Sequence, residues 1–122
     1  MSITTFTPLG PQSLITANTT AATGVQLPVF GNAQASTFML INNSGNSVNI
    51  GWASPAVGAA AAATAATPPT GNASLTVVNG TGSIVLPNAT VRAIRTQFPN
   101  PFFSAFAFTA NGNCYIVPGD GV

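Results

Sequence analysis

The stretch that decides the fold is Ser36–Trp52, STFMLINNSGNSVNIGW, in which two apolar runs flank a run of Asn, Ser and Gly. In its second half Val48, Ile50 and Trp52 alternate with small or polar residues, a period of two that is typical of a half-buried antiparallel strand. The first half is apolar on both parities and predicts a central strand. Because Asn and Gly accept the backbone angles of tight turns, residues 36–52 are predicted to form a hairpin.

Similar short runs recur on both sides of this stretch. Residues 12–16 and 24–30 are expected to pair as a first hairpin, and residues 73–79 and 83–86 as another, closed by Asn79-Gly80. Pro87-Asn88 makes the next break, and further strands are expected in VRAIR, in FFSAFAFTA and in NCYIV, which ends at Pro118. About eight short strands with frequent turn signals predict an all-β, antiparallel, jelly-roll-like β-sandwich that spans residues 1–122 as one domain.

An Ala-rich segment at about 57–72 interrupts this pattern. Ala is the best intrinsic helix former, so a short helix ended by Pro68 is one interpretation. The segment has no large apolar residues at helical spacing that a helix could bury, which favours the other interpretation, a loop that projects from the sandwich.

Formal charge is almost absent from the chain. Its charged side chains are Arg92, Arg95 and Asp120, about 2% of 122 residues, and it has no His, Lys or Glu. Proteins bind nucleic acids largely through Lys and Arg side chains that release counterions from the phosphates. Two Arg side chains provide little of this free energy, so no nucleic-acid partner is expected. General acid and base catalysis, nucleophilic catalysis and metal binding each need residue types that are missing or single here, so the chain is expected not to be an enzyme and to hold no cofactor or metal. The single Cys114 is interpreted as a small apolar strand residue.

The few charges and aromatic side chains are the candidate interaction residues. Arg92 and Arg95 are an odd number of residues apart, so on one strand they point to opposite faces. Both can be solvated, or one can pair with Asp120 or with the carboxylate of Val122, in the same subunit or across an interface. The sequence VPGDGV predicts a short terminal tail, either frayed or docked on a neighbour, that presents the aspartate.

Two aromatic side chains leave a further alternative open. Trp52 and Tyr115 could form a platform for sugars on a neutral surface, but their alternating apolar neighbours favour core packing. No secretory signal or membrane-spanning run is recognised, so the chain is expected to be made in a cytoplasm, to remain soluble and to have no membrane partner.

Four segments carry a resemblance to a known group of proteins: FTPLGP near the start, FMLINNSGNSVNIGWA, LPNATVRAI and the ending YIVPGDGV. Together, and in this order, they resemble small structural proteins of tailed bacteriophages whose genes lie near that of the major capsid protein. Such proteins typically open with a phrase like FTPLGP and finish in Pro-Gly-Asp-Gly or Pro-Gly-Glu-Gly plus one apolar residue. The Ala-rich segment departs from the shorter loop expected there.

The resemblance implies a capsid decoration, or cement, protein that binds the outer surface of the phage head. Its partners would be the major capsid protein and itself, as a homodimer or homotrimer, and its location the virion after synthesis in the host bacterium. A head-tail connector or a tail, fibre or spike component is the alternative, although repeats and heptads typical of fibres are missing. A carbohydrate-binding module is the second alternative.

Overall fold

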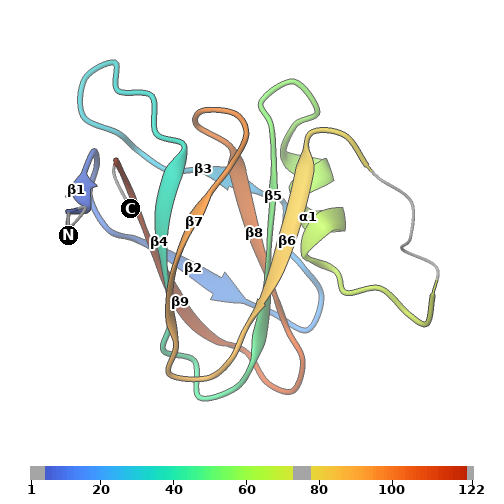
Figure 1. Ribbon diagram of the computed structural model, residues 1–122. Helices are drawn as coiled ribbons and strands as arrows, with labels where there is room; N and C mark the ends of the chain where they lie inside the picture. Colours follow the sequence, from blue (N-terminus) through green and yellow to red (C-terminus); the bar gives the residue numbers. More distant parts are fainter. Residues whose placement is uncertain (1–4, 73–77, 121–122) are drawn as a thin grey trace.

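The protein, seen here as a computed structural model, folds into two antiparallel β-sheets and one helix (Figure 1). The structure describes residues 5–72 and 78–120. Within these residues the elements are β1 (Thr7–Pro8), β2 (Ser13–Ala17), β3 (Val25–Gln26), β4 (Thr37–Asn42), β5 (Val48–Ala53), α1 (Ala59–Ala66), β6 (Thr81–Leu86), β7 (Val91–Arg95), β8 (Phe102–Ala107) and β9 (Gly112–Asp120). The expected antiparallel β-sandwich is confirmed.

The strands pair in a nested order. Sheet A has the order β1-β9-β4-β7, with β2 also paired to β9, and sheet B has the order β3-β8-β5-β6. Strand β2 therefore pairs with β9, β3 with β8, β4 with β7 and β5 with β6, each pair enclosing the next. Strands β6 and β7 end the two sheets on the same side of the sandwich, at the front of Figure 1.

The predicted hairpin at residues 36–52 is wrong in its pairing, although both of its strands exist. Strand β4 lies in sheet A and β5 in sheet B, so the chain arches from one sheet to the other. The buried amide of Asn42 holds this arch: its Nδ2 donates to the carbonyl oxygens of Asn46 at 2.7 Å and Leu86 at 2.9 Å. Each strand then finds its hydrogen-bond partners in segments far away in the sequence.

Of the other two expected hairpins, the first is wrong and the second lies partly outside the described residues. Residues 12–16 and 24–30 do not pair with each other, because β2 pairs with β9 and β3 with β8. The expected strand at 73–79 lies largely outside the described residues. Gly80 has the positive φ, +78°, that its predicted turn requires, and Pro87-Asn88 ends β6 as expected.

The core lies between the sheets, where the inward side chains of both meet. Phe38 of β4 and Phe103 of β8 touch edge to face, with ring centroids 4.8 Å apart, and join the sheets at the centre. Trp52 packs against the same cluster, as predicted. Cys114 is 1% exposed within this core, which agrees with its interpretation as a small apolar strand residue.

Helix α1 lies on the outer face of sheet B, so the favoured projecting loop is wrong for residues 59–66 (Figure 1). The helix and the sheet pack closely because the residues between them have small side chains or none. A Cβ at Gly51 of β5 would overlap the backbone of Ala66, and Ala62 and Ala66 are fully buried. Asn49 Nδ2 donates to the Ala66 carbonyl at 2.6 Å, which satisfies an acceptor at the end of the helix. The search for large apolar residues missed this close packing.

The two ends of the described chain lie side by side. Thr7 and Pro8 pair with Asp120 and Gly119, so β9 continues through Pro118 and the expected terminal tail is wrong for Asp120. Pro118 fits inside the strand because its backbone groups face away from β4: its carbonyl accepts a hydrogen bond from the Leu9 amide at 2.8 Å, so the missing N–H removes no bond to β4.

Candidate interaction surfaces

The outer face of sheet A carries large apolar side chains that no helix or strand of the described residues covers. Alternation along the strands places Cys114 and Ile116 inward and Tyr115 and Val117 outward. On β4, likewise, Phe38 and Leu40 point inward and are buried, and Met39 and Ile41 point outward. We call the following set the sheet A face: Leu14, Met39, Ile41, Val91, Ala93, Tyr115 and Val117.

Strand register arranges the sheet A face in two rows. Residues opposite each other in antiparallel strands share a face, so one row runs across β2, β9, β4 and β7 as Leu14, Tyr115, Ile41 and Val91. The next row is Val117, Met39 and Ala93. Leu14 is 54% exposed and Val91 59% exposed, while the other members are half-buried by their neighbours.

Polar and small residues bound the rows at both ends of the sheet. At one end Thr16 and Asn113 are opposite each other, and both are exposed. At the other end Gly119, Thr37 and Arg95 form the row, and the ring of Phe6 lies against Gly119. The face therefore has an apolar centre, with exposed polar residues at the Thr16–Asn113 end and at Arg95, whereas Thr37 and Gly119 are buried.

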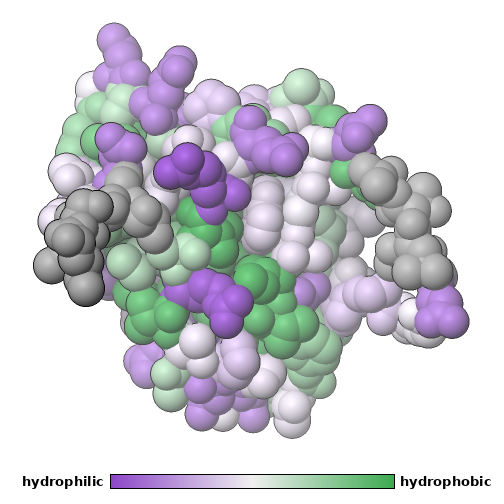
Figure 2. Space-filling model, in the orientation of Figure 1, coloured by the Kyte–Doolittle hydropathy of each residue, from purple (hydrophilic) through white to green (hydrophobic). Residues whose placement is uncertain are grey.

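The two arginines lie on β7, the edge strand of sheet A, and both are exposed. Arg95 has the parity of Val91 and points to the outer side, whereas Arg92 has the parity of Ile94, which packs against the core. Arg92 therefore points toward the side between β6 and β7. In Figure 2, where these strands are at the front, hydrophobic and strongly hydrophilic residues lie next to each other.

Asp120 lies on β9, an inner strand of sheet A, at the same end of the sheet as Arg95. Arg95 is opposite Thr37 and Thr37 is opposite Gly119, so two strand spacings, about 10 Å, separate the strands that carry Arg95 and Asp120. Alternation along β9 places Asp120 on the side of Ile116 and Pro118, whereas Arg95 is on the outer side. Among residues 5–72 and 78–120 no ion pair joins the three charged side chains, so an arginine paired with Asp120 in the same subunit is not found there. Val122 lies outside the described residues.

Tyr115 corrects a prediction and shows what the sequence reasoning missed. It was expected in the core with Trp52, but it lies on the sheet A face. The available signal was the second apolar parity of β4: it was used only to predict a central strand, which the structure has, and it places Met39 and Ile41 on the outer face, where they remain at the surface.

Among the described residues, the titratable side chain that lies in the core is Cys114. Burial raises the pKa of the Cys114 thiol to about 11, so at neutral pH the sulfur stays protonated and poorly nucleophilic. Its Sγ lies 3.8 Å from Asn42 Oδ1. In the described part of the chain no three His, Cys, Asp or Glu side chains gather as metal ligands would.

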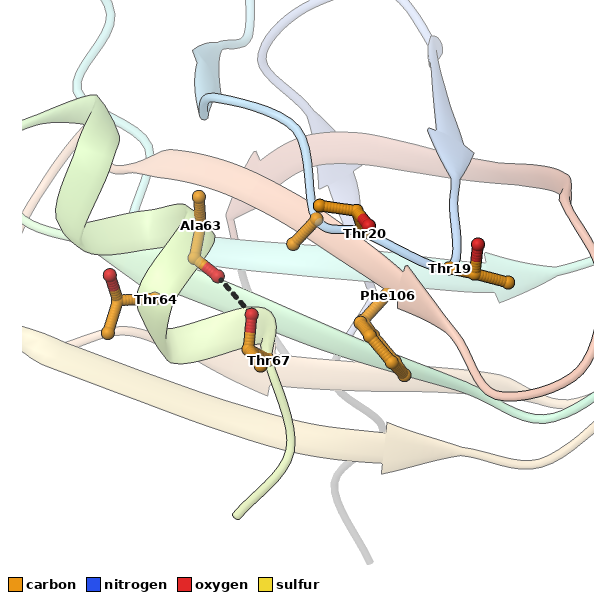
Figure 3. Close-up of a pocket in the computed structure, with 7 residues that line it drawn as sticks. Thr19, Thr20, Ala63, Thr64, Thr67 and Phe106 are labelled. Atoms are coloured by element: carbon orange, nitrogen blue, oxygen red, sulfur yellow. Dashed lines mark hydrogen bonds between the residues drawn. The ribbon is translucent and has the colours of Figure 1, made fainter. Parts of the chain in front are cut away.

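A shallow groove of about 290 Å³ lies beside α1 (Figure 3). Thr19 and Thr20 line it from the loop after β2, Thr64 and Thr67 from the helix and its end, and Phe106 from β8. Thr64 and Thr67 already donate their hydroxyls to the carbonyls of Ala60 and Ala63, at 3.2 and 3.1 Å. The groove thus offers an uncharged lining of hydroxyl oxygens and one aromatic ring.

Comparisons with protein-family models, with curated proteins and with solved structures find no match to this chain. None of the helices in the described residues has the length and apolar character needed to span a membrane.

Proposed function

We propose that the protein is a non-enzymatic structural component of a tailed-phage virion, a decoration protein that binds the outside of the head and bridges major capsid protein subunits. The observation that carries the proposal is where the four resembling segments lie. FTPLGP contains β1, FMLINNSGNSVNIGWA contains most of β4 and all of β5, LPNATVRAI contains most of β7 and YIVPGDGV contains most of β9. Four of these five strands are the main path of sheet A, the sheet with the uncovered apolar face, and β5 is a central strand of sheet B.

The nested strand order adds support from the fold. We interpret the pairing of β2 with β9, β3 with β8, β4 with β7 and β5 with β6 as a jelly roll. Jelly rolls occur in viral capsid proteins and in lectins, so the architecture suits the proposal without selecting it.

The composition supports a role at high local concentration. A nearly uncharged surface adds little mutual repulsion when many copies are crowded on one shell. Weak contacts repeated over a fixed lattice gain strength by avidity, so each bridge between capsid subunits needs only a modest apolar contact.

The test is quantitative mass spectrometry of purified virions together with cryo-electron microscopy of the same particles. The proposal expects hundreds of copies over the shell, at two-fold or three-fold positions. A handful of copies at one vertex or along the tail would contradict it and favour the alternative of a connector or a tail, fibre or spike component.

The groove beside α1 favours a second candidate function, carbohydrate binding. Phe106 lines the groove and touches Phe108, which is 45% exposed, with ring centroids 5.6 Å apart. Exposed rings beside hydroxyl groups suit the apolar and polar faces of a sugar. A glycan array on which the protein binds nothing would remove this candidate, and binding that Phe106→Ala abolishes would support it.

A further inference from the structure

The chain contains two Asn-Gly dipeptides, Asn79-Gly80 and Asn111-Gly112, which lie in different structural environments. Asn-Gly is prone to deamidation because glycine has no Cβ to shield its backbone nitrogen from the side-chain amide of the preceding residue. We propose that Asn79 is a site of spontaneous deamidation in the folded protein and that the fold protects Asn111. The inference concerns the chain itself and is independent of the proposed function.

The reaction needs only water besides the protein. The backbone nitrogen of Gly80 attacks Cγ of Asn79 and closes a succinimide ring, the bond from Cγ to Nδ2 breaks, and ammonia leaves with the proton of the Gly80 N–H. Water then opens the ring at either carbonyl, which gives aspartate or isoaspartate, and nothing is oxidised or reduced. The attack requires a Gly80 N–H that can lose its proton and an Asn79 side chain that can rotate toward it.

Asn79 meets these requirements. It is exposed, and with Gly80, whose φ is +78°, it forms the turn that leads into β6. In residues 5–72 and 78–120 no backbone acceptor binds the Gly80 N–H. The Gly80 carbonyl accepts a hydrogen bond from the Ser54 amide at 2.7 Å, so the Ser54 carbonyl would be the next acceptor in a continued ladder. That carbonyl instead accepts from the amides of Val57 and Gly58, at 3.2 and 3.0 Å.

Asn111 is exposed as well, but its environment restrains both reacting groups. Its Oδ1 atom accepts a hydrogen bond from the Thr19 amide at 3.3 Å, which orients the side chain. Gly112 is the first residue of β9 and pairs with Ala17 of β2. The next carbonyl along β9 accepts a hydrogen bond from the residue after β4, so alternation directs the Gly112 N–H toward β2. The nitrogen that would attack is therefore held in the ladder, and deamidation at Asn111 requires local opening of β9.

Deamidation at position 79 changes a chain that carries very few charges. The new carboxylate joins a single acidic side chain, Asp120, and lowers the formal net charge from +1 to zero. Isoaspartate also adds a methylene to the backbone of the turn, next to the hydrogen bond between the Gly80 carbonyl and the Ser54 amide. This bond joins the start of β6 to the end of β5, so older molecules acquire a different charge and a looser edge of sheet B.

Peptide mapping by mass spectrometry tests the proposal. Folded protein is incubated at neutral and at mildly alkaline pH, and conversion of the two Asn-Gly sites is followed over time. Asn79 is expected to convert at least about tenfold faster than Asn111, because only Asn111 requires local opening. The rate at Asn79 is expected to rise with pH, since the attacking nitrogen must lose its proton. In protein denatured with urea the two rates are expected to lie within about threefold of each other.

Asn79→Gln is the matched control, because it keeps an exposed amide whose longer side chain does not close the succinimide ring. On isoelectric focusing, aged wild type is expected to gain an acidic band at the position of Asn79→Asp, and aged Asn79→Gln is expected to keep its original band. Three results would overturn the proposal: Asn111 converts as fast as Asn79 in the folded protein, Asn79 converts in urea but not in the fold, or Asn79→Gln acidifies as fast as wild type. If the glutamine variant fails to fold, the peptide map of wild type decides.

Discussion

The two outer faces of the sandwich are built in opposite ways. On sheet B the outward residues of β5 are small or hydrogen-bonded, and helix α1 approaches until the backbones nearly touch at Gly51 and Ala66. On sheet A the outward residues of β4 are Met39 and Ile41, and they remain at the surface. The contrast teaches that small outward residues mark the face that the chain covers with its own helix, while large ones mark the face that the described residues leave uncovered.

The largest effect is expected from a single added methyl under the helix. Gly51→Ala puts a Cβ into the backbone of Ala66, which cannot move aside without lifting α1, so the variant should lose about 3 kcal/mol of unfolding free energy. Chemical denaturation measures the loss. Ala93→Val, which enlarges a residue on the uncovered face, is the control and should change stability by less than about 0.5 kcal/mol. Equal losses in both variants would break the comparison of the faces.

The next prediction concerns Cys114, which lies on the inner face of sheet A and precedes Tyr115 in the chain. Burial raises the pKa of Cys114 to about 11 from 9.0, so between these values the unfolded thiol has lost its proton while the folded thiol retains it. The folded state is therefore stabilised fully below pH 9, and about 2–3 kcal/mol of stability is lost as pH rises to 11.

Unfolding measured at pH 8.5 and at pH 11 in wild type and Cys114→Ser tests this contribution. The serine variant should lose less stability than wild type over that interval. An identical pH dependence would contradict the burial of the thiol on the inner face.

A smaller effect is expected where one side chain holds the helix on sheet B. Asn49→Ala removes the hydrogen bond to the Ala66 carbonyl and leaves that acceptor buried, which should cost about 1–2 kcal/mol. Hydrogen exchange should show faster exchange in α1 than in sheet A. Uniformly faster exchange throughout the molecule would mean that helix and sheet unfold together, and it would weaken the view of α1 as a separately docked cover.

The smallest effect on folding is expected at the centre of the sheet A face. Ile41→Thr keeps a β-branched residue in the strand and removes apolar area only from the surface, so the monomer's unfolding free energy should change by less than about 0.5 kcal/mol. Chemical denaturation measures the change. A large loss of stability would show that the fold depends on the packing of Ile41 at the surface.

The sequence was informative about strands and misleading about their partners. Alternation located β4, β5, β8 and β9 within a few residues, because burying one side of a strand imposes a period of two. Hairpin reasoning then paired neighbours in the chain, whereas the loop folded around Asn42 carries the chain to the opposite sheet. The hydrogen bonds from the Asn42 side chain to the carbonyls of Asn46 and Leu86 produce no periodic pattern in the sequence, so the pattern does not predict them.

The helix and the chain ends failed for related reasons. The periodicity analysis looks for large apolar side chains at helical spacing. Helix α1 instead packs on sheet B through the small residues Gly51 and Ala66. The rule that Pro ends a strand failed at Pro118 because the backbone groups of this residue face Leu9 rather than β4, so the missing N–H interrupts no hydrogen bond to β4. The candidate residues Arg92, Arg95 and Asp120 could be picked out by rarity alone, but only the strand register places two of them at one end of sheet A.

The most direct test of the central claim, that the chain covers sheet B with its own helix and leaves the sheet A face uncovered, is maleimide labelling of variants that each carry one added cysteine. Leu14→Cys and Val91→Cys place the thiol on the sheet A face, where the native residues are 54% and 59% exposed. Ala62→Cys places it under α1, where the native residue is fully buried. The account predicts rapid labelling of the two sheet A variants in the folded protein and little labelling of Ala62→Cys. Labelling of Ala62→Cys as fast as that of Leu14→Cys, or slow labelling of both sheet A variants, would contradict it.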